Sequence, residues 1–208
     1  MATTRSEAPV RRGGRPSRRD EILRSAMDLF ASGGSRGTCL ADIAHQTGLA
    51  PSAILHHFGS KDALLMEVLA AIDERDAAIV PRAKGQSAWD RLSALRDWAI
   101  VLERDQGRAQ LARLATVLAA EGLNPEHPAH GPIVARFRRL RASVAHTIRL
   151  AQKEGSVRGD ADARRVAAEV VGAMLGVQFQ WLLDSATVPL HDLYRAYFDR
   201  LLGDLATR

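Results

Sequence analysis

The sequence predicts an all-α protein, and three observations support this fold class. Helix-forming residues, above all Ala, Leu and Arg, supply much of the 208-residue chain. Apolar residues recur every three or four positions over most of its length, which is the spacing of one face of a helix. β-Branched residues occur only in short, scattered runs. The chain is long enough to bury a substantial core in one or two domains.

Glycine, proline and polar clusters divide the chain into its predicted elements. Helices are expected at about 18–33, 39–46 and 50–56, after Ser60, and at about 87–104, 107–121, 133–153, 163–184 and 189–205. Gly33 and Gly34 end the first helix, and the pattern breaks again between Pro81 and Ser87. We therefore expect a flexible basic arm at 1–17, a three-helix domain at 18–65 and a larger helical domain at 66–208.

The charge distribution and the cysteine content indicate the kind of partner and the cellular compartment of the protein. Residues 1–20 carry six arginines against Glu7 and Asp20, so most of the net charge of +5 lies at one end of the chain. A basic arm on a near-neutral body favours a polyanionic partner, although a solubilising tail has the same composition. The sequence lacks an unbroken apolar run of about 18–20 residues and an apolar segment behind the basic start. The single cysteine, Cys39, cannot form an internal disulfide, so we expect a cytoplasmic protein without a membrane span.

Residues 38–61 have the pattern of a helix-turn-helix. Thr38 is a suitable N-cap for the helix at 39–46. Gly48 supplies the positive φ that a sharp turn between helices needs, and Leu49 is expected to fill the angle between them. Ile54 continues the buried face on the next helix. The remaining positions, Ala50, Pro51, Ser52 and His56, then lie on the outer face, where small residues let the backbone approach base edges in a major groove.

This segment resembles the TetR family of bacterial regulators. The resemblance covers about residues 18–70: Leu-Phe-Ala-x-Gly-Gly, then Thr-x-x-x-Asp-Ile-Ala, then Gly-Leu and Ala-Ile-Leu-His-His-Phe-x-Ser-Lys-x-x-Leu-Leu. It implies a phosphate contact for Thr38 and for Lys61. It also implies that Pro51, Ser52 and His56 lie in or beside the groove, with His57 at the helix end. Two positions depart from the family pattern, which usually has Tyr at Leu55 and an aromatic residue at Ser35.

The basic arm gains a specific role in this context. Arg12-Gly13-Gly14-Arg15-Pro16 resembles the core of an AT-hook, with one glycine where that core usually has arginine. A flexible arginine that precedes a helix-turn-helix can enter the adjacent minor groove. We therefore expect Arg15 to contact DNA there.

The larger domain is expected to dimerise and to hold a small molecule. Two apolar stripes near its end predict a homodimer face, part of which is intramolecular core: Val166, Val170, Met174, Val177 and Trp181 on one helix, and Leu190, Leu193, Tyr197 and Leu201 on the next. Candidate walls of a ligand pocket lie among the central helices, although residues at this spacing are also typical of plain core. They are Trp89, Trp98, Leu102, Leu118, Phe137 and Phe179, with Gln178 as a polar anchor.

These features predict a DNA-binding repressor that a small-molecule effector releases from a double-stranded operator. The alternative is an effector-independent or architectural DNA-binding dimer. A helical-bundle enzyme with two metals would need paired Glu-x-x-His motifs, which the sequence lacks, so we expect neither a catalytic site nor a cofactor. Asp42 with His45, and Glu126 with His127 and His130, have spacings compatible with a metal but make poor sites, so no metal is expected.

Overall fold

The computed structural model describes residues 17–76 and 86–207, and it confirms the all-α fold class. The arm with Arg15 and the break at Pro81 lie outside these ranges. Within them, the helices are α1 Arg18–Gly37, α2 Leu40–Thr47, α3 Pro51–Phe58, α4 Lys61–Asp76, α5 Ala88–Ala94, α6 Trp98–Arg104, α7 Gln106–Glu121, α8 His130–Lys153, α9 Ala163–Leu183 and α10 Leu190–Leu205. In the described part of the chain, the only β-type pairing is an isolated bridge between Val157 and Ala206.

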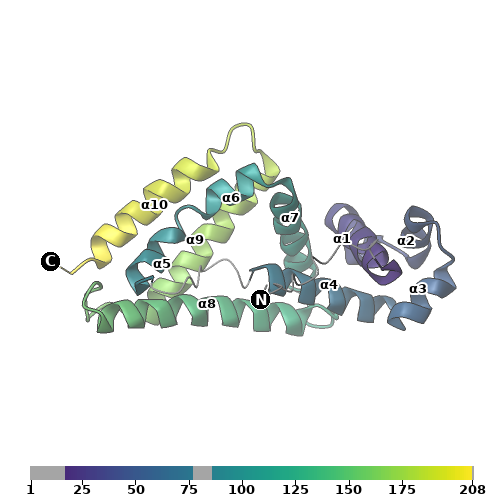
Figure 1. The fold of residues 1–208 in the computed structure, drawn as a ribbon, viewed down its shortest axis with the longest axis horizontal. Coiled ribbons are helices and arrows are strands. Elements are labelled where there is room, and N and C mark those ends of the chain that lie inside the picture. The colour runs from purple at the N-terminus through teal and green to yellow at the C-terminus, as the bar shows by residue number, and fades with distance from the viewer. Residues whose placement is uncertain (1–16, 77–85, 208) are drawn as a thin grey trace, which may run out of the picture.

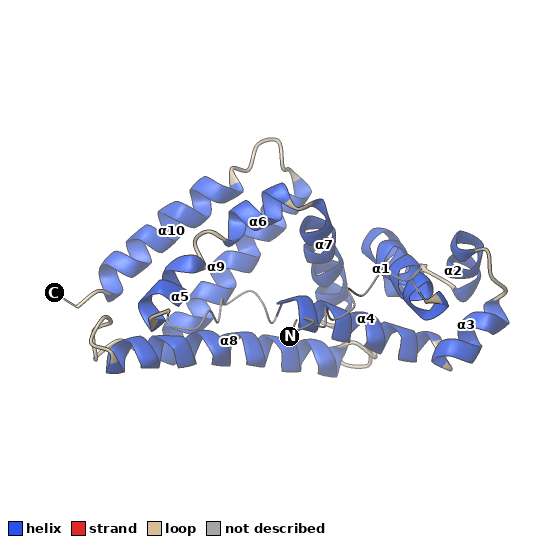
Figure 2. Ribbon diagram, viewed as in Figure 1, coloured by secondary structure: helices blue, strands red, loops and turns tan. Residues whose placement is uncertain are grey.

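The helices fall into two groups in space. α1, α2 and α3 cluster at one end of the molecule, and α4 runs from them toward the rest (Figure 1). In the other group, α7, α8 and α9 form the sides of a triangle, and α5, α6 and α10 pack onto it (Figure 2). Helices thus make up both groups, and α4 connects them.

The core of the N-terminal helices continues into the larger group. Phe30, Ile43, Ile54 and Leu64 are almost completely buried in this core, and burial of a side chain of this size stabilises the fold by roughly 1.5–3 kcal/mol. The same cluster includes α7 residues such as Leu118. The predicted boundary at residues 65 and 66 falls inside the continuous helix α4. The division into domains at that point therefore stays a prediction.

The end of α1 differs from the prediction. The chain bends at Gly34, which has a φ of +73°, and then makes one more turn up to Gly37. Cys39, and not Thr38, is the N-cap of α2. The physical reason is that the Thr38 hydroxyl lies in the core and donates to the backbone oxygen of Gly34, 2.9 Å away.

Two other helix boundaries were predicted wrongly. The helix expected at 87–104 is two helices, α5 and α6, because the chain between Ala94 and Trp98 closes i→i+3 hydrogen bonds that tighten and redirect it. In addition, α8 begins at His130, whereas the sequence predicted residue 133. Pro132 suggested a loop there, but a proline in the first turn removes only an N–H group that has no partner within the helix.

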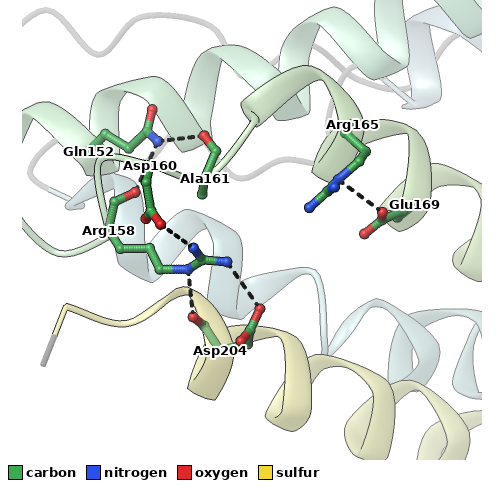
Figure 3. A network of polar contacts seen from close by, with 7 residues as sticks. All are labelled: Gln152, Arg158, Asp160, Ala161, Arg165, Glu169 and Asp204. Carbon is green, nitrogen blue, oxygen red and sulfur yellow. Dashed lines mark hydrogen bonds and ion pairs between the residues drawn. The ribbon is translucent and has the colours of Figure 1, made fainter.

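The turn between α8 and α9 is tied to the end of α10 (Figure 3). Arg158 donates from Nε to the backbone oxygen of Asp204 at 3.1 Å and pairs with the Asp160 carboxylate at 2.8 Å. The Gln152 amide donates to the backbone oxygens of Arg158 and Ala161. Asp162 caps α9 by accepting the N–H groups of Arg164 and Arg165. These contacts fix the angle between α8, α9 and α10.

Among the described residues, one helix is long and apolar enough to span a membrane by length and composition alone. This helix is α9, with a mean hydropathy of 1.5 over its best window. Its N-terminal half packs into the core, where Val166 and Val170 are buried. Within the isolated chain, however, most of that window is not buried. The apolar surface of α9 therefore needs a further partner.

Candidate DNA interface and ligand cavity

The turn between α2 and α3 has the geometry that the sequence predicted. Gly48 has a φ of +66°, and its N–H group reaches the backbone oxygens of Ala44 and His45 at the end of α2. Leu49 is partly buried against the core, and Ile54 is 1% exposed. α3 is thereby held at a fixed angle to α2, with one face turned outward.

The outer face of α3 carries the residues expected to read DNA. Ala50, Pro51, Ser52, His56 and His57 are all exposed. The N-cap, Ala50, makes no side-chain capping bond, and the first turn has no acidic residue. The partial positive charge at this helix end is therefore available to a phosphate or a base edge.

The beginning of α4 presents a cation beside this face. Lys61 is the first residue of α4 and is partly exposed, and the Ser60 hydroxyl oxygen accepts the Ala63 N–H at 3.0 Å. In the last turn of α3, the buried ring of Phe58 packs under the Arg19 guanidinium of α1, which lies 4.9 Å from the ring centre. Lys61 thus follows directly after a helix end that is packed against α1.

Thr38 does not fit its predicted role. Its side chain is 4% exposed, and its hydroxyl faces the backbone oxygens of Gly34 and Leu29. The hydroxyl is therefore not presented to a phosphate. Leu55, where the family usually has tyrosine, is 42% exposed on the same side as the reading residues. An apolar contact, such as one to a thymine methyl group, can replace the missing hydroxyl contact there.

A polar joint connects the helix-turn-helix to the larger group of helices. Glu121, at the end of α7, accepts the Ser35 hydroxyl at 2.6 Å, the Ser35 N–H at 3.0 Å and the Arg36 N–H at 3.1 Å. His127 is buried; its Nδ1 accepts the Ala129 N–H, so the Nε2–H of the neutral ring faces the Ser35 hydroxyl at 3.3 Å. Ser35, the second departure from the family pattern, is therefore a buried polar contact to Glu121.

The environment of Glu121 keeps it ionised. Burial alone would raise the pKa of this carboxyl, but the hydrogen bonds from Ser35 and Arg36 outweigh burial and lower the pKa below its ordinary value. Gly34 is required at this place, because a Cβ there would lie 2.6 Å from the Glu121 Oε1, and the backbone has a positive φ. The carboxylate thus packs directly against the bend in α1.

A large cavity lies among α6, α7, α8 and α9. Its volume is about 790 Å³, which is within the range of small-molecule sites. Five of the predicted wall residues line it: Trp98, Leu102, Phe137, Gln178 and Phe179. Trp89 and Leu118 do not. Trp89 lies on α5, which packs against α8, and Leu118 faces the core shared with the helix-turn-helix.

The cavity also has charged residues, which the sequence did not predict. Arg136 and Arg139 of α8 both pair with Asp73 of α4, and the distance from Arg136 to Asp73 is 2.8 Å. Arg108 of α7 stacks over Trp98 at 5.6 Å. In the sequence, these arginines look like the solvated face of a helix, because only the fold brings α4 next to α8. Glu121 was missed for the same reason.

In the described part of the chain, no group of three metal-binding side chains comes together. His130 instead lies 2.8 Å from the backbone oxygen of Gly122, and His127 belongs to the Ser35 contact. Both are structural histidines in this loop.

The outer sides of α9 and α10 form a shallow, mostly apolar depression. It is lined by Glu169, Gly172, Ala173, Tyr197, Arg200, Leu201 and Asp204. A Cβ at Gly172 would meet nothing within 4 Å. The Tyr197 hydroxyl is buried without a hydrogen-bond partner among the described residues. Val166, Val170 and Leu190, by contrast, are buried inside the chain, so this part of the predicted stripes is intramolecular core.

An all-α chain with an exposed helix-turn-helix at one end defines a class of DNA-binding protein, and comparison with known proteins shows which of these proteins it resembles. Residues 22–68 match the family model of bacterial regulatory proteins of the tetR family. The repressor KstR2 of Mycolicibacterium smegmatis is 43% identical over 53 residues, about a quarter of each chain. KstR2 of Rhodococcus jostii is 25% identical over 93% of this chain and 94% of its own.

A solved structure agrees over nearly the whole length. A TetR transcriptional regulator from Chloroflexus aurantiacus has a TM-score of 0.79 at 21% identity, and the match covers 92% of this chain and 97% of that one. At this identity the match shows the fold. Together with the match at 22–68, these findings support a TetR-type DNA-binding transcriptional regulator.

The position of Lys61 gives a testable expectation. We expect Lys61→Ala to remove a phosphate contact, so that affinity falls by a similar factor for every DNA sequence and the salt dependence becomes shallower by roughly one unit of slope. Lys153→Ala, at the far end of α8, is the matched control, and we expect it to leave the affinity for DNA and its salt dependence unchanged. Fluorescence anisotropy with specific and random duplexes at several salt concentrations measures this. A loss confined to one sequence would contradict the assignment.

Proposed function

We propose that this regulator is a repressor that binds its operator as a homodimer and leaves it when a small molecule fills the cavity. The observation that carries this proposal is the cavity of about 790 Å³, because its lining includes Asp73 on α4, the helix that begins with Lys61 at the DNA face. A purely architectural dimer has no need for such a space. The names of the KstR2 relatives, which are repressors, support the sign of regulation.

The proposed operator contacts follow from exposure and charge. Pro51, Ser52 and His56 lie in the major groove. The small side chain of Ala50 lets the protein backbone approach the DNA closely, and Leu55 lies beside the reading residues. His57 and Lys61 contact the sugar–phosphate backbone at the helix end. Arg15, outside the described residues, enters the neighbouring minor groove. Such a protein works on chromosomal DNA, so we place it in the cytoplasm.

The proposed dimer uses the depression on α9 and α10. The missing side chain at Gly172 allows a partner helix to approach closely, and the buried Tyr197 hydroxyl needs a hydrogen-bond partner. Exposed apolar residues on the two helices, including Leu183 and Leu193, add area that dimerisation would bury.

The dimer is tested by a charge placed on this face. Gly172→Arg puts a guanidinium into the interface, so we expect a monomer at micromolar concentration, whereas the native chain has the dimer mass. Gly131→Arg is the control, because Gly131 on α8 has equally open space around it. Multi-angle light scattering gives the masses. If Gly172→Arg keeps the dimer mass, this face is not the interface.

Release by a ligand is tested by filling the cavity. Ala115 of α7 lines it, and the exposed Ala120 of the same helix does not. Operators are first selected from random DNA, and a metabolite panel is then screened for release by fluorescence anisotropy. We expect that Ala115→Trp still binds the operator but responds to the active compound at least tenfold more weakly, while Ala120→Trp responds normally. If no compound releases the native protein, the architectural alternative is favoured.

A further inference from the structure

The described lining of the cavity has an excess of positive charge at an otherwise apolar site. Its ionisable residues are three arginines, Arg108, Arg136 and Arg139, and a single aspartate, Asp73. The walls around them are largely apolar, with Leu102, Leu111 and Leu140 as examples. A ligand with a negative head and an apolar body matches both properties, because it pairs the arginines and removes its body from water.

The arginines and Asp73 form a small ion-pair cluster at the side of the cavity next to α4. Arg136 pairs with one carboxylate oxygen of Asp73 and Arg139 with the other. The two arginines are three residues apart on α8, so they project from the same face of the helix. Arg136 has further interactions besides this one, whereas Arg139 reaches solvent, with 59% of its side chain exposed.

A competing anion can displace this arrangement. Asp73 is 35% exposed, and ion pairs with this much solvent access contribute little to stability. An incoming carboxylate or phosphate can offer one oxygen to Arg136 and another to Arg139, as Asp73 does. Its apolar body adds affinity of about fourfold for each methylene that it buries against the walls. An amphipathic anion can therefore outcompete Asp73 where a small anion cannot.

The aromatic walls do not favour the opposite charge. Trp98, Phe137 and Phe179 could surround an alkylammonium group by cation–π contacts. The face of Trp98, however, already carries the guanidinium of Arg108. A second cation there would be repelled by the arginines of the lining.

We propose that the effector is an amphipathic anion, a carboxylate or phosphate ester, whose head binds Arg136 and Arg139 in place of Asp73. This inference rests on the proposed function of the cavity and adds the chemical class of its ligand. Displaced from its partners, Asp73 no longer ties α4 to α8. Because α4 also begins with Lys61, the loss of this tie reaches the DNA face along one helix.

Four probes that share one alkyl chain test the charge preference. They are decanoate, decyl phosphate, decanol and decyltrimethylammonium, all used below their micelle concentration. Isothermal titration calorimetry of the full chain is expected to give at least tenfold tighter binding for an anion than for decanol, with decyltrimethylammonium the weakest. The tighter of the two anions identifies the head group. The inference is overturned if neither anion binds more tightly than the alcohol of the same chain length, in this series and in the hexyl and tetradecyl series.

Variants test the assigned residues. Arg139→Gln should weaken binding of the preferred anion about tenfold and leave that of decanol unchanged, because only the head contact is lost. Asp73→Asn should strengthen anion binding by about tenfold, because it removes the competing charge. The matched control is Arg138→Gln, since Arg138 is exposed on the same helix and does not line the cavity. Circular dichroism establishes that each variant is folded. Equal affinities for the native, Arg139→Gln and Asp73→Asn proteins would refute the proposed head site.

Operator release is measured separately, so that the two proposals fail in different ways. If an anion binds selectively but leaves operator affinity unchanged, the ligand class stands and effector release is wrong. If a neutral or cationic compound releases the operator and the anions do not bind, effector release stands and the ligand class is wrong.

Discussion

Glu121 joins the helix-turn-helix to the larger group of helices through three hydrogen bonds, all of them to the bend that ends α1. Hydrogen bonds to a charged group contribute about 1.5–3 kcal/mol each, and breaking them would leave a partly buried carboxylate without donors. The bend itself exists because Gly34 has a positive φ and no Cβ to collide with this carboxylate. The orientation of α2 and α3 relative to the cavity thus depends on this polar contact as well as on the apolar core that α1 shares with α7.

The second connection between the two groups is α4. Its beginning supports Lys61, its middle is buried in the N-terminal core, and Asp73 near its end pairs with α8. The first connection is stiff, because Glu121 lies among buried partners such as Ser35 and His127. The second has solvent access and sits at a cavity. In the proposed mechanism of release, the ligand therefore acts on the second connection while the first holds the domain in place, and the helix-turn-helix turns about the first.

The parts of the fold that depend on neighbouring residues could be predicted from the sequence. Gly48, Leu49 and Ile54 determine the helix-turn-helix by local geometry and periodicity, and the structure has each of them as expected. Helix termini were less predictable, because a residue such as Thr38 can cap a helix or bond another backbone oxygen. Similarly, Pro132 is compatible with a loop or with the first turn of a helix. Thr38 found a backbone partner in the bend, and the helix start moved to Cys39.

The contacts between distant helices could not be predicted. Trp89 and Leu118 have the same apolar character as Trp98 and Leu102, and only the packing of α5 and α7 decides which of them face the cavity. Likewise, Glu121, Asp73 and Arg139 have the spacing of ordinary surface charges. Their roles arise from partners 63 to 86 residues away in the chain.

The distance between the two helix-turn-helix units of the dimer tests most directly whether Glu121 sets their position. Cys39, the only cysteine, is exposed at the start of α2 and accepts a spin label. Double electron–electron resonance should give a narrow distance distribution for the native protein and for Glu126→Gln, an exposed carboxyl of the neighbouring loop. For Glu121→Gln, with its helix content unchanged, the distribution should be broad or shifted. Superimposable distributions for the native protein and Glu121→Gln would contradict the account.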